Sequence, residues 1–144
     1  MWSVACVLGE MICHQPILPG NSTMNQVEKI LELTGIPSED ETKRFESPYA
    51  KIMIECVSIF KRVELRDICQ GACTNTINFM KSLMNLNPQK RCSAELALRH
   101  PFVSDCHDPK SEYTYPYGSI QVRLCTSRNF YLSHQFCRIY FPFL

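Results

Sequence analysis

The residues of this sequence best able to bind a metal ion are its cysteines and histidines. Nine cysteines occur at irregular spacing, and no two of them form a C-x-x-C pair. Cys69 and Cys73 lie four positions apart, and Cys106 directly precedes His107. Structural zinc sites use paired ligands at characteristic short spacings, which these positions lack. We therefore predict no metal site, and we expect reduced thiols rather than a disulfide framework.

Catalytic residues are equally hard to find. A hydrolase would need an activated nucleophile beside a base, and the chain offers four histidines as bases: His14, His100, His107 and His134. No G-x-S-x-G or comparable nucleophile motif accompanies them. The five glycines are scattered, so a G-x-G-x-x-G phosphate-binding loop cannot form. We assign no catalytic and no cofactor-binding residue.

Composition restricts the class of protein further. The chain has 144 residues, of which 45% are hydrophobic and 20% charged, with a formal net charge of +1. This length and apolar content predict one globular domain rather than a disordered chain. The balanced charge argues against nucleic acid as a partner. The apolar run at the N-terminus lacks a basic leader and is too short to cross a bilayer, so we expect no membrane partner and a cytosolic protein.

Apolar periodicity predicts a mainly helical fold. Residues 1–13 are apolar nearly all round a helical wheel, which predicts a helix buried on every side. A capping box of Thr23 and Gln26 and a stop at Gly35 predict a helix over 23–34, and apolar spacing predicts another over 49–60. A helix is also predicted over 74–86, with Thr74 or Asn75 as its cap. The last predicted helix, 94–98, has Ser93 as its cap and ends near His100. Residues 62–71 show no clear period and are interpreted as an irregular insert.

The last part of the chain differs in composition. Nine of the fifteen aromatic residues lie within positions 113–144, with few helix caps and no steady period. No fold follows from this pattern. We expect residues 110–144 to form an irregular aromatic-rich tail.

Two separated motifs give the chain a family resemblance. Residues 1–11 resemble the long buried helix of protein kinases, and residues 16–20 resemble the loop that follows it. Residues 86–91 and 94–102 resemble the closing motif of the same catalytic domain. The resemblance implies the helical C-lobe of the protein-kinase fold, truncated, over residues 1–109, with an insert at about 38–73. Residues 18–20 and 23–34 are most similar to mitogen-activated protein kinases. The atypical extracellular-signal-regulated-kinase branch is favoured, and other members of the wider cyclin-dependent and mitogen-activated group stay open.

The resemblance implies roles for four residues, Trp2, Val7, Met11 and Arg91, as structural residues of kinase motifs. Val7 and Met11 would support the hydrophobic column beneath the adenine ring, and in this chain we expect them to be core residues. Arg91 would pair with the glutamate that ends the activation segment, which this sequence lacks. Since an unpaired buried charge is costly, Arg91 is expected to be more exposed than in a complete kinase, or to pair with Glu10 or Glu95.

A docking site is also implied by the resemblance. Asp105, Asp108 and Glu112 fall where these kinases carry an acidic groove for basic linear motifs of partner proteins. Lys110 and Ser111 dilute the negative charge. An ordinary polar linker is the alternative interpretation.

The family transfers phosphate from Mg-ATP to serine or threonine of proteins, but the groups for this reaction are not located here. Residues 65–67, Leu-Arg-Asp, come nearest to the H-R-D-L-x-x-x-N loop, yet Ala72 stands where the asparagine belongs. We therefore expect a kinase fragment that is inactive alone and needs no cofactor itself. Its intact parent would use Mg-ATP in intracellular signalling. The expected location is the cytoplasm, with the nucleus as a second location. The alternatives are a non-catalytic module that binds kinase partners or substrates, and a truncated gene product whose residues from 113 onward are not kinase sequence.

Overall fold

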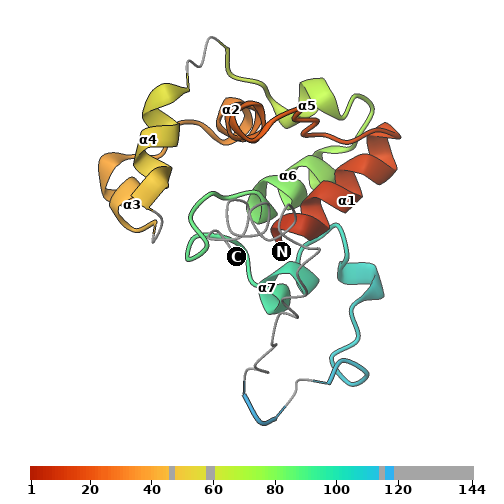
Figure 1. Ribbon diagram of the computed structural model, residues 1–144. Coiled ribbons are helices and arrows are strands. Elements are labelled where there is room, and N and C mark those ends of the chain that lie inside the picture. The colour runs from red at the N-terminus through yellow and green to blue at the C-terminus, as the bar shows by residue number, and fades with distance from the viewer. Residues whose placement is uncertain (46–47, 58–60, 114–115, 119–144) are drawn as a thin grey trace, which may run out of the picture.

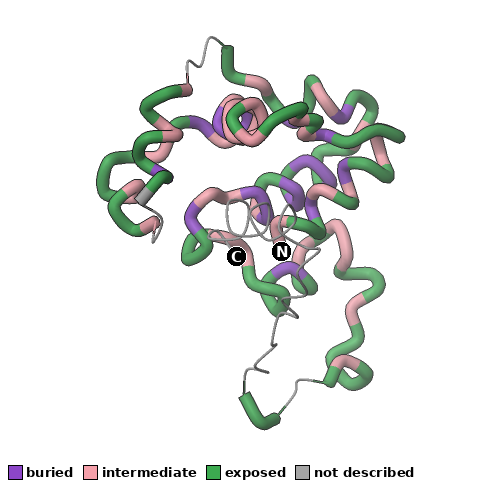
Figure 2. Tube along the Cα trace, in the orientation of Figure 1, coloured by how far each residue is buried: buried purple, intermediate pink, exposed green. Residues whose placement is uncertain are grey.

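The crossing of helices α1, Trp2–Cys13, and α6, Thr74–Leu83, forms the centre of the fold in the computed structural model (Figure 1). The structure describes residues 1–45, 48–57, 61–113 and 116–118. Ala5 of α1 and Met80 and Leu83 of α6 are fully buried at 0% exposure. Buried residues gather on α6 and on the elements that face it (Figure 2). The core therefore depends on α6, which carries five buried residues within its length.

A glycine permits the close packing around α1. A Cβ atom at position 9 would lie 2.7 Å from Ile17 Cγ2 and 2.9 Å from Met80 Cε. Such distances are shorter than ordinary van der Waals contacts, so the absent side chain is what lets residue 17 and α6 approach the helix. Helix α1 then ends at His14, whose φ of 56° is left-handed and whose backbone N–H donates to Glu10 O at 2.8 Å.

The prediction that α1 is buried on every side is wrong. Val4, Val7 and Met11 are 47%, 58% and 69% exposed. The described elements pack against the face that carries Ala5 and Gly9, and these three side chains lie outside that contact. One side of a helix that is apolar nearly all round is left uncovered by the described residues.

The N-cap of helix α2, Thr23–Thr34, lies one residue before the predicted one. Ser22, not Thr23, is the N-cap, and its hydroxyl accepts the Asn25 N–H at 3.2 Å. Gln26 does reach backward, but its Oε1 accepts the Gly20 N–H at 2.9 Å instead of completing a capping box. The predicted stop is confirmed, because Gly35 follows the helix with a φ of 88°.

The insert at about 38–73 is more helical than predicted. It contains α3, Glu39–Lys43, α4, Pro48–Cys56, and α5, Leu65–Ile68. Helix α4 confirms most of the predicted 49–60 helix, of which residues 58–60 lie outside the described residues. The interpretation of 62–71 as irregular is wrong, because α5 packs against α6 and its Leu65 is 3% exposed. A single buried turn has no periodicity to recognise.

Helix α7, Ala94–Leu98, is capped by the Ser93 hydroxyl, which accepts the Leu96 N–H at 3.3 Å, as predicted. Helix α6 departs from its prediction at both ends: its N-cap is Cys73 rather than Thr74 or Asn75, and it ends at Leu83 rather than at 86. After α7, Phe102 stacks on Phe79 of α6 with ring centroids 5.1 Å apart. A short 3-10 helix, η1, Ser104–Cys106, follows.

The prediction of a mainly α fold is confirmed, since the described residues contain helices and no strand. Of the predicted tail, residues 119–144 and positions 114–115 lie outside the described residues. Within the part that the structure describes, no helix has both the length and the apolar character needed to cross a membrane.

Candidate functional site

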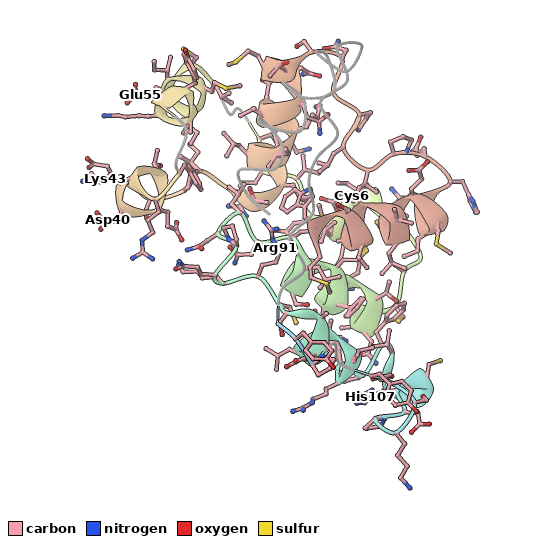
Figure 3. The ribbon with its side chains drawn as sticks, turned by 60° about the horizontal axis from the view of Figure 1, so that its bottom comes forward. Cys6, Asp40, Lys43, Glu55, Arg91 and His107 are labelled. Atoms are coloured by element: carbon pink, nitrogen blue, oxygen red, sulfur yellow. The ribbon has the colours of Figure 1, made fainter. Side chains whose placement is uncertain are left out.

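The contact between Arg91 and Trp2 is the first of three features that could form part of a functional site. The Arg91 Cζ atom lies 5.5 Å from the centre of the Trp2 ring, at the start of α1. Arg91 Nε donates a hydrogen bond to Asn85 O at 3.1 Å. Its Nη2 is buried and has no hydrogen-bond partner among the described residues. Burial lowers the pKa of the Arg91 guanidinium. Figure 3 shows this side chain lying beside α1.

The expected acid partner of Arg91 is not found. Within the described residues, Arg91 forms no ion pair with Glu10 or Glu95, so the second of the two alternatives predicted for it is not observed. An aromatic face and a backbone carbonyl contact the cation instead. The prediction that Arg91 is more exposed here than in a complete kinase stays a prediction.

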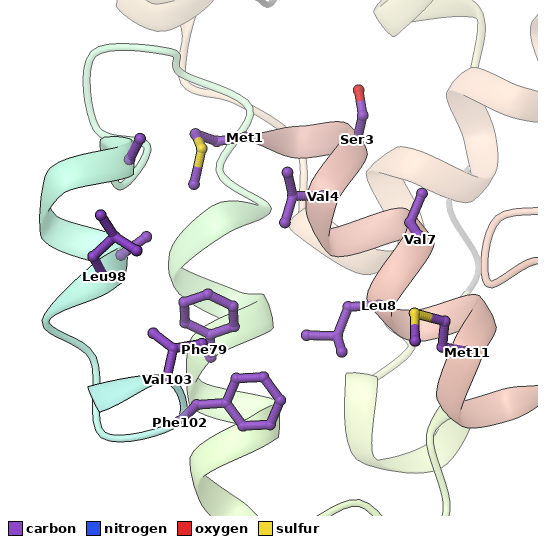
Figure 4. A pocket seen from close by; sticks show the side chains of 12 residues that line it. Met1, Ser3, Val4, Val7, Leu8, Met11, Phe79, Leu98, Phe102 and Val103 are labelled. Atoms are coloured by element: carbon purple, nitrogen blue, oxygen red, sulfur yellow. The ribbon is translucent and has the colours of Figure 1, made fainter. Parts of the chain in front are cut away.

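The second surface is an apolar groove of about 650 Å³ between α1 and α7, which we call the α1–α7 groove. In Figure 4, residues of α1 line one side, and Leu98 and Val103 line the other, with Phe79 and Phe102 between them. Ser3 contributes the hydroxyl group of the lining, and the other lining side chains are apolar: Met1, Val4, Val7, Leu8, Met11, Phe79, Ala94, Ala97, Leu98, Phe102 and Val103. Such a lining suits apolar side chains rather than phosphate or a metal ion.

The exposure of Val7 and Met11 corrects their predicted place in the core. Both line the α1–α7 groove and are more than half exposed, at 58% and 69%. Trp2, the third motif residue of α1, is partly buried and packs against the core cluster. The sequence therefore identifies the helix correctly but not the side of it that the described residues cover.

The third surface is the predicted acidic docking segment, in and after η1. Asp105 and Asp108 are exposed. Glu112 is engaged on both carboxylate oxygens: its Oε2 lies 2.7 Å from His107 Nδ1, and its Oε1 accepts the Asp108 N–H at 3.1 Å. The structure thus brings Asp108 and Glu112 together in one closed turn. Two of the three acids remain open to solvent, and the third is held by a histidine.

Sequence reasoning missed a contact between two thiols. The Sγ atoms of Cys13 and Cys69 lie 3.1 Å apart although the residues are 56 positions apart in the chain. No short-range spacing could have indicated this contact, because it depends on how α5 packs beside the end of α1. The described residues contain no group of three or more His, Cys, Asp or Glu side chains suited to a metal ion. Asp67, from the nearest match to a catalytic loop, is exposed on α5.

Comparison with known proteins gives a consistent result. Residues 1–103 match the family described as "Protein kinase domain". The chain is 41% identical over 112 residues to extracellular signal-regulated kinase 2 of Dictyostelium discoideum, an alignment that covers 78% of this chain and 30% of that protein. It is 36% identical over 121 residues to mitogen-activated protein kinase 15 of Xenopus laevis, covering 83% of this chain and 21% of that protein.

A more distant relative belongs to the same group. Mitogen-activated protein kinase p38b of Drosophila melanogaster is 32% identical over 114 residues, covering 79% of this chain and 31% of that protein. The chain thus spans less than a third of the length of each of these relatives.

Proposed function

The chain belongs to the protein kinase domain family and is similar to mitogen-activated protein kinases, and we propose that it supplies the helical lower part of a serine/threonine kinase catalytic domain. In this proposal residues 1–109 are the kinase-derived part. The intact parent transfers phosphate from Mg-ATP to proteins in a signalling pathway, and this chain alone does not. The proposed location is the cytoplasm, with the nucleus as a second site.

The exposed side of α1 is the observation that carries this proposal. Val4, Val7 and Met11 present a contiguous apolar strip along a helix at the centre of the fold, beside a groove of about 650 Å³. A helix that is apolar on nearly all sides is normally covered on all sides. Further kinase chain packed over this strip explains why its residues are apolar although they are exposed here.

Two pockets formed by the described residues do not fit Mg-ATP. Magnesium with nucleotide phosphates needs carboxylate oxygens and clustered backbone or cationic donors, whereas the α1–α7 groove is lined almost wholly by apolar side chains. The smaller pocket, of about 190 Å³, is lined by Glu41 and Lys90, which pair with each other at 2.7 Å. Neither surface offers an unpaired carboxylate beside a phosphate-binding loop, so we assign Mg-ATP to the parent and not to this chain.

A kinase assay on the purified full chain tests the proposal. We expect no phosphate transfer from Mg-ATP to a general protein substrate, and no shift of Tm on addition of Mg-ATP. The variant Asp67→Asn is the diagnostic control, since it alters the nearest match to a catalytic aspartate. Activity that co-purifies with the chain and is lost in Asp67→Asn would overturn the assignment of this chain as non-catalytic.

A second candidate function is a non-catalytic module that binds basic segments of kinase partners or substrates. The observation that favours it is the exposure of Asp105 and Asp108 next to a turn already ordered by Glu112. Fluorescence polarisation with a Lys/Arg-rich peptide tests it. We expect weaker binding after Asp105→Asn and Asp108→Asn, and unchanged binding after Asp67→Asn, a matched substitution at an exposed position of α5. Equal affinity in all four proteins would contradict docking at this segment.

The length of the endogenous protein decides whether this sequence acts as a short chain or as part of a complete kinase. An antibody against residues 23–46 would report the mass of the endogenous protein on a denaturing gel. A band near 16.7 kDa supports a short product that acts as an interaction module. A band more than twice as heavy supports a complete kinase that contains this sequence, and residues from 113 onward would then be compared with the parent's own sequence.

A further inference from the structure

Two thiols meet where the end of α1 packs beside α5. Cys13 is the last residue of α1, and Cys69 is the C-cap residue of α5. The Cys13 S–H donates to Cys69 Sγ at 3.1 Å and lies 3.5 Å from Ile68 O. Among the described residues, no other two cysteine sulfurs are in hydrogen-bonding contact. The contact joins the central helix to the insert across 56 positions of chain.

Both cysteines lie at the ends of helices, where a small shift toward a shorter contact disturbs few backbone hydrogen bonds. A disulfide requires the sulfurs to approach to about 2.05 Å, so the pair must close by about 1 Å. Cys13 precedes His14, where the chain turns out of the helix with a left-handed φ of 56°. Cys69 has φ −97° and ψ 64°, outside the helical region. Neither residue is fixed in a helix interior, where a shift would break a series of backbone hydrogen bonds.

The two thiols differ in access to solvent. Cys13 is partly exposed, whereas Cys69 is only 2% exposed. The pKa of the Cys69 thiol is raised to about 12. Burial is the larger cause, and the neighbouring Cys13 thiol is the smaller one. A water-borne oxidant can therefore reach Cys13 first. The raised pKa keeps Cys69 in its thiol form, so the 3.1 Å contact, and not thiolate character, is what favours its reaction with the oxidised Cys13 sulfur.

We propose that Cys13 and Cys69 form a reversible disulfide that responds to hydrogen peroxide and ties α1 to α5. The proposal rests on this thiol pair alone and holds whether or not the chain acts as part of a kinase. It places a modification site between the central helix and the insert.

The reaction balances in two steps. The Cys13 sulfur attacks one oxygen of hydrogen peroxide, the O–O bond breaks, and the thiol proton leaves with the other oxygen as water, which gives a Cys13 sulfenic acid. The Cys69 sulfur then attacks the Cys13 sulfur. The S–S bond forms, the S–O bond breaks, and the hydroxyl leaves with the Cys69 proton as a second water. Two electrons pass from the sulfurs to peroxide, and a dithiol reductant reverses the change.

The disulfide would stabilise the fold. It closes a loop of more than fifty residues, which restricts the unfolded chain strongly, and for a protein of this size we expect Tm to rise by about 10 °C. The segment between the two cysteines contains α2, α3, α4 and α5, so oxidation would close this segment into a loop that is anchored at the end of α1.

The experiment treats the full chain with hydrogen peroxide and digests it with trypsin without reduction. We expect a cross-linked species that joins the peptide of residues 1–29 to the peptide of residues 67–81, and its loss on treatment with dithiothreitol. Each peptide contains a second cysteine, Cys6 or Cys73. The variants Cys6→Ser and Cys73→Ser are therefore the matched controls, and both should retain the cross-link and the rise in Tm.

Cys13→Ser and Cys69→Ala should abolish both the cross-link and the rise in Tm. Cys13→Ser is the safer variant, because position 13 is partly exposed and the substitution preserves size. Cys73 provides a demanding comparison, since it is exposed and the Thr76 hydroxyl lowers the pKa of its thiol. A cross-link that disappears in Cys73→Ser, or peroxide treatment that leaves Cys13 as a sulfinic or sulfonic acid without a disulfide, would overturn the proposal.

Discussion

Arg91 is a partly buried cation that forms no ion pair with a carboxylate of the described residues. Its Nε bonds to Asn85 O at 3.1 Å, its Cζ lies 5.5 Å from the Trp2 ring centre, and its Nη2 is buried without a partner. The hydrogen bond and the cation–π contact are each favourable by about 1 kcal/mol, while an unsatisfied buried donor costs about 1 to 3 kcal/mol. These terms nearly cancel, so the stability of this chain should depend little on the charge of residue 91.

The first prediction follows from that balance. Arg91→Met keeps an apolar stem against Trp2 and removes the unsatisfied donor, so the free energy of unfolding should change by less than about 1 kcal/mol. Urea denaturation measures this value, and Arg99→Met, at an exposed position on the next helix, is the matched control. A loss above about 3 kcal/mol for Arg91→Met alone would mean that a carboxylate outside the described residues pairs with Arg91.

At the scale of elements, α6 contributes more to the core than any other described helix. Leu83 is 0% exposed and belongs to a core cluster that also contains buried residues of α1, α2, α5 and α7. Removing a large side chain there leaves a cavity that packed helices cannot readily fill.

We predict that Leu83→Ala lowers the free energy of unfolding by about 2 to 5 kcal/mol. Leu96→Ala is the matched control, because Leu96 lies in α7 and is 60% exposed. That change should cost less than about 0.5 kcal/mol. Chemical denaturation followed by circular dichroism gives both values, and similar losses in the two variants would contradict the central place of α6.

The elements also show what the sequence could predict. Helix α1 was predicted from its continuous apolar run. Helices α2, α4, α6 and α7 were predicted from local apolar spacing, supported at α2 by the stop at Gly35. Helix α5 was missed because its single buried turn is defined by α6, which lies later in the chain. The covered side of α1 could not be predicted either, since a helix that is apolar nearly all round gives no sign of which face meets its neighbours. The Cys13–Cys69 contact depends on the same tertiary packing.

At the scale of the whole molecule, one ion pair joins the insert to the segment after α6. Lys90 Nζ lies 2.7 Å from Glu41 Oε1, and these residues are 49 positions apart. The hydrogen bond from Lys90, followed by that from the Ser38 backbone, lowers the pKa of the Glu41 carboxyl below its ordinary value of 4.5. The lowered pKa means that the folded state favours the charged carboxylate.

This shift predicts a pH effect with a definite sign. The contribution of Glu41 to stability is present above pH 4.5 and is lost as the pH falls through the lower folded pKa. The Tm difference between the original chain and Glu41→Gln should therefore be largest near neutral pH and shrink below pH 4.5. Glu95→Gln is the control, because Glu95 is an exposed residue of α7 that forms no ion pair within the described residues. The Tm of this variant should run parallel to that of the original chain. A Glu41→Gln difference that does not change with pH would contradict the ion pair.

The exposed apolar strip on α1, formed by Val4, Val7 and Met11, gives the surface of the molecule an apolar patch. Val7→Glu and Met11→Glu place charges in the α1–α7 groove at positions already more than half exposed, so the free energy of unfolding should change by less than about 1 kcal/mol. Binding of an apolar fluorescent dye should fall, because a large apolar patch is its binding site. Ile52→Glu is the control, because Ile52 of α4 is 57% exposed, and it should leave most dye binding intact. Unchanged dye binding in the α1 variants would mean that the groove is already covered.

The missing side chain at position 9 couples distant parts of the chain. Because Ile17 Cγ2 and Met80 Cε occupy the space that a Cβ would need, residues 9, 17 and 80 share one volume. A methyl group added at position 9 is tolerated only if another is removed at 17 or 80, so the effects of Gly9→Ala and Ile17→Val on stability should not add. In sequences that keep this fold, a larger residue at position 9 should therefore occur together with a smaller one at 17 or 80. The three positions are expected to vary as a set.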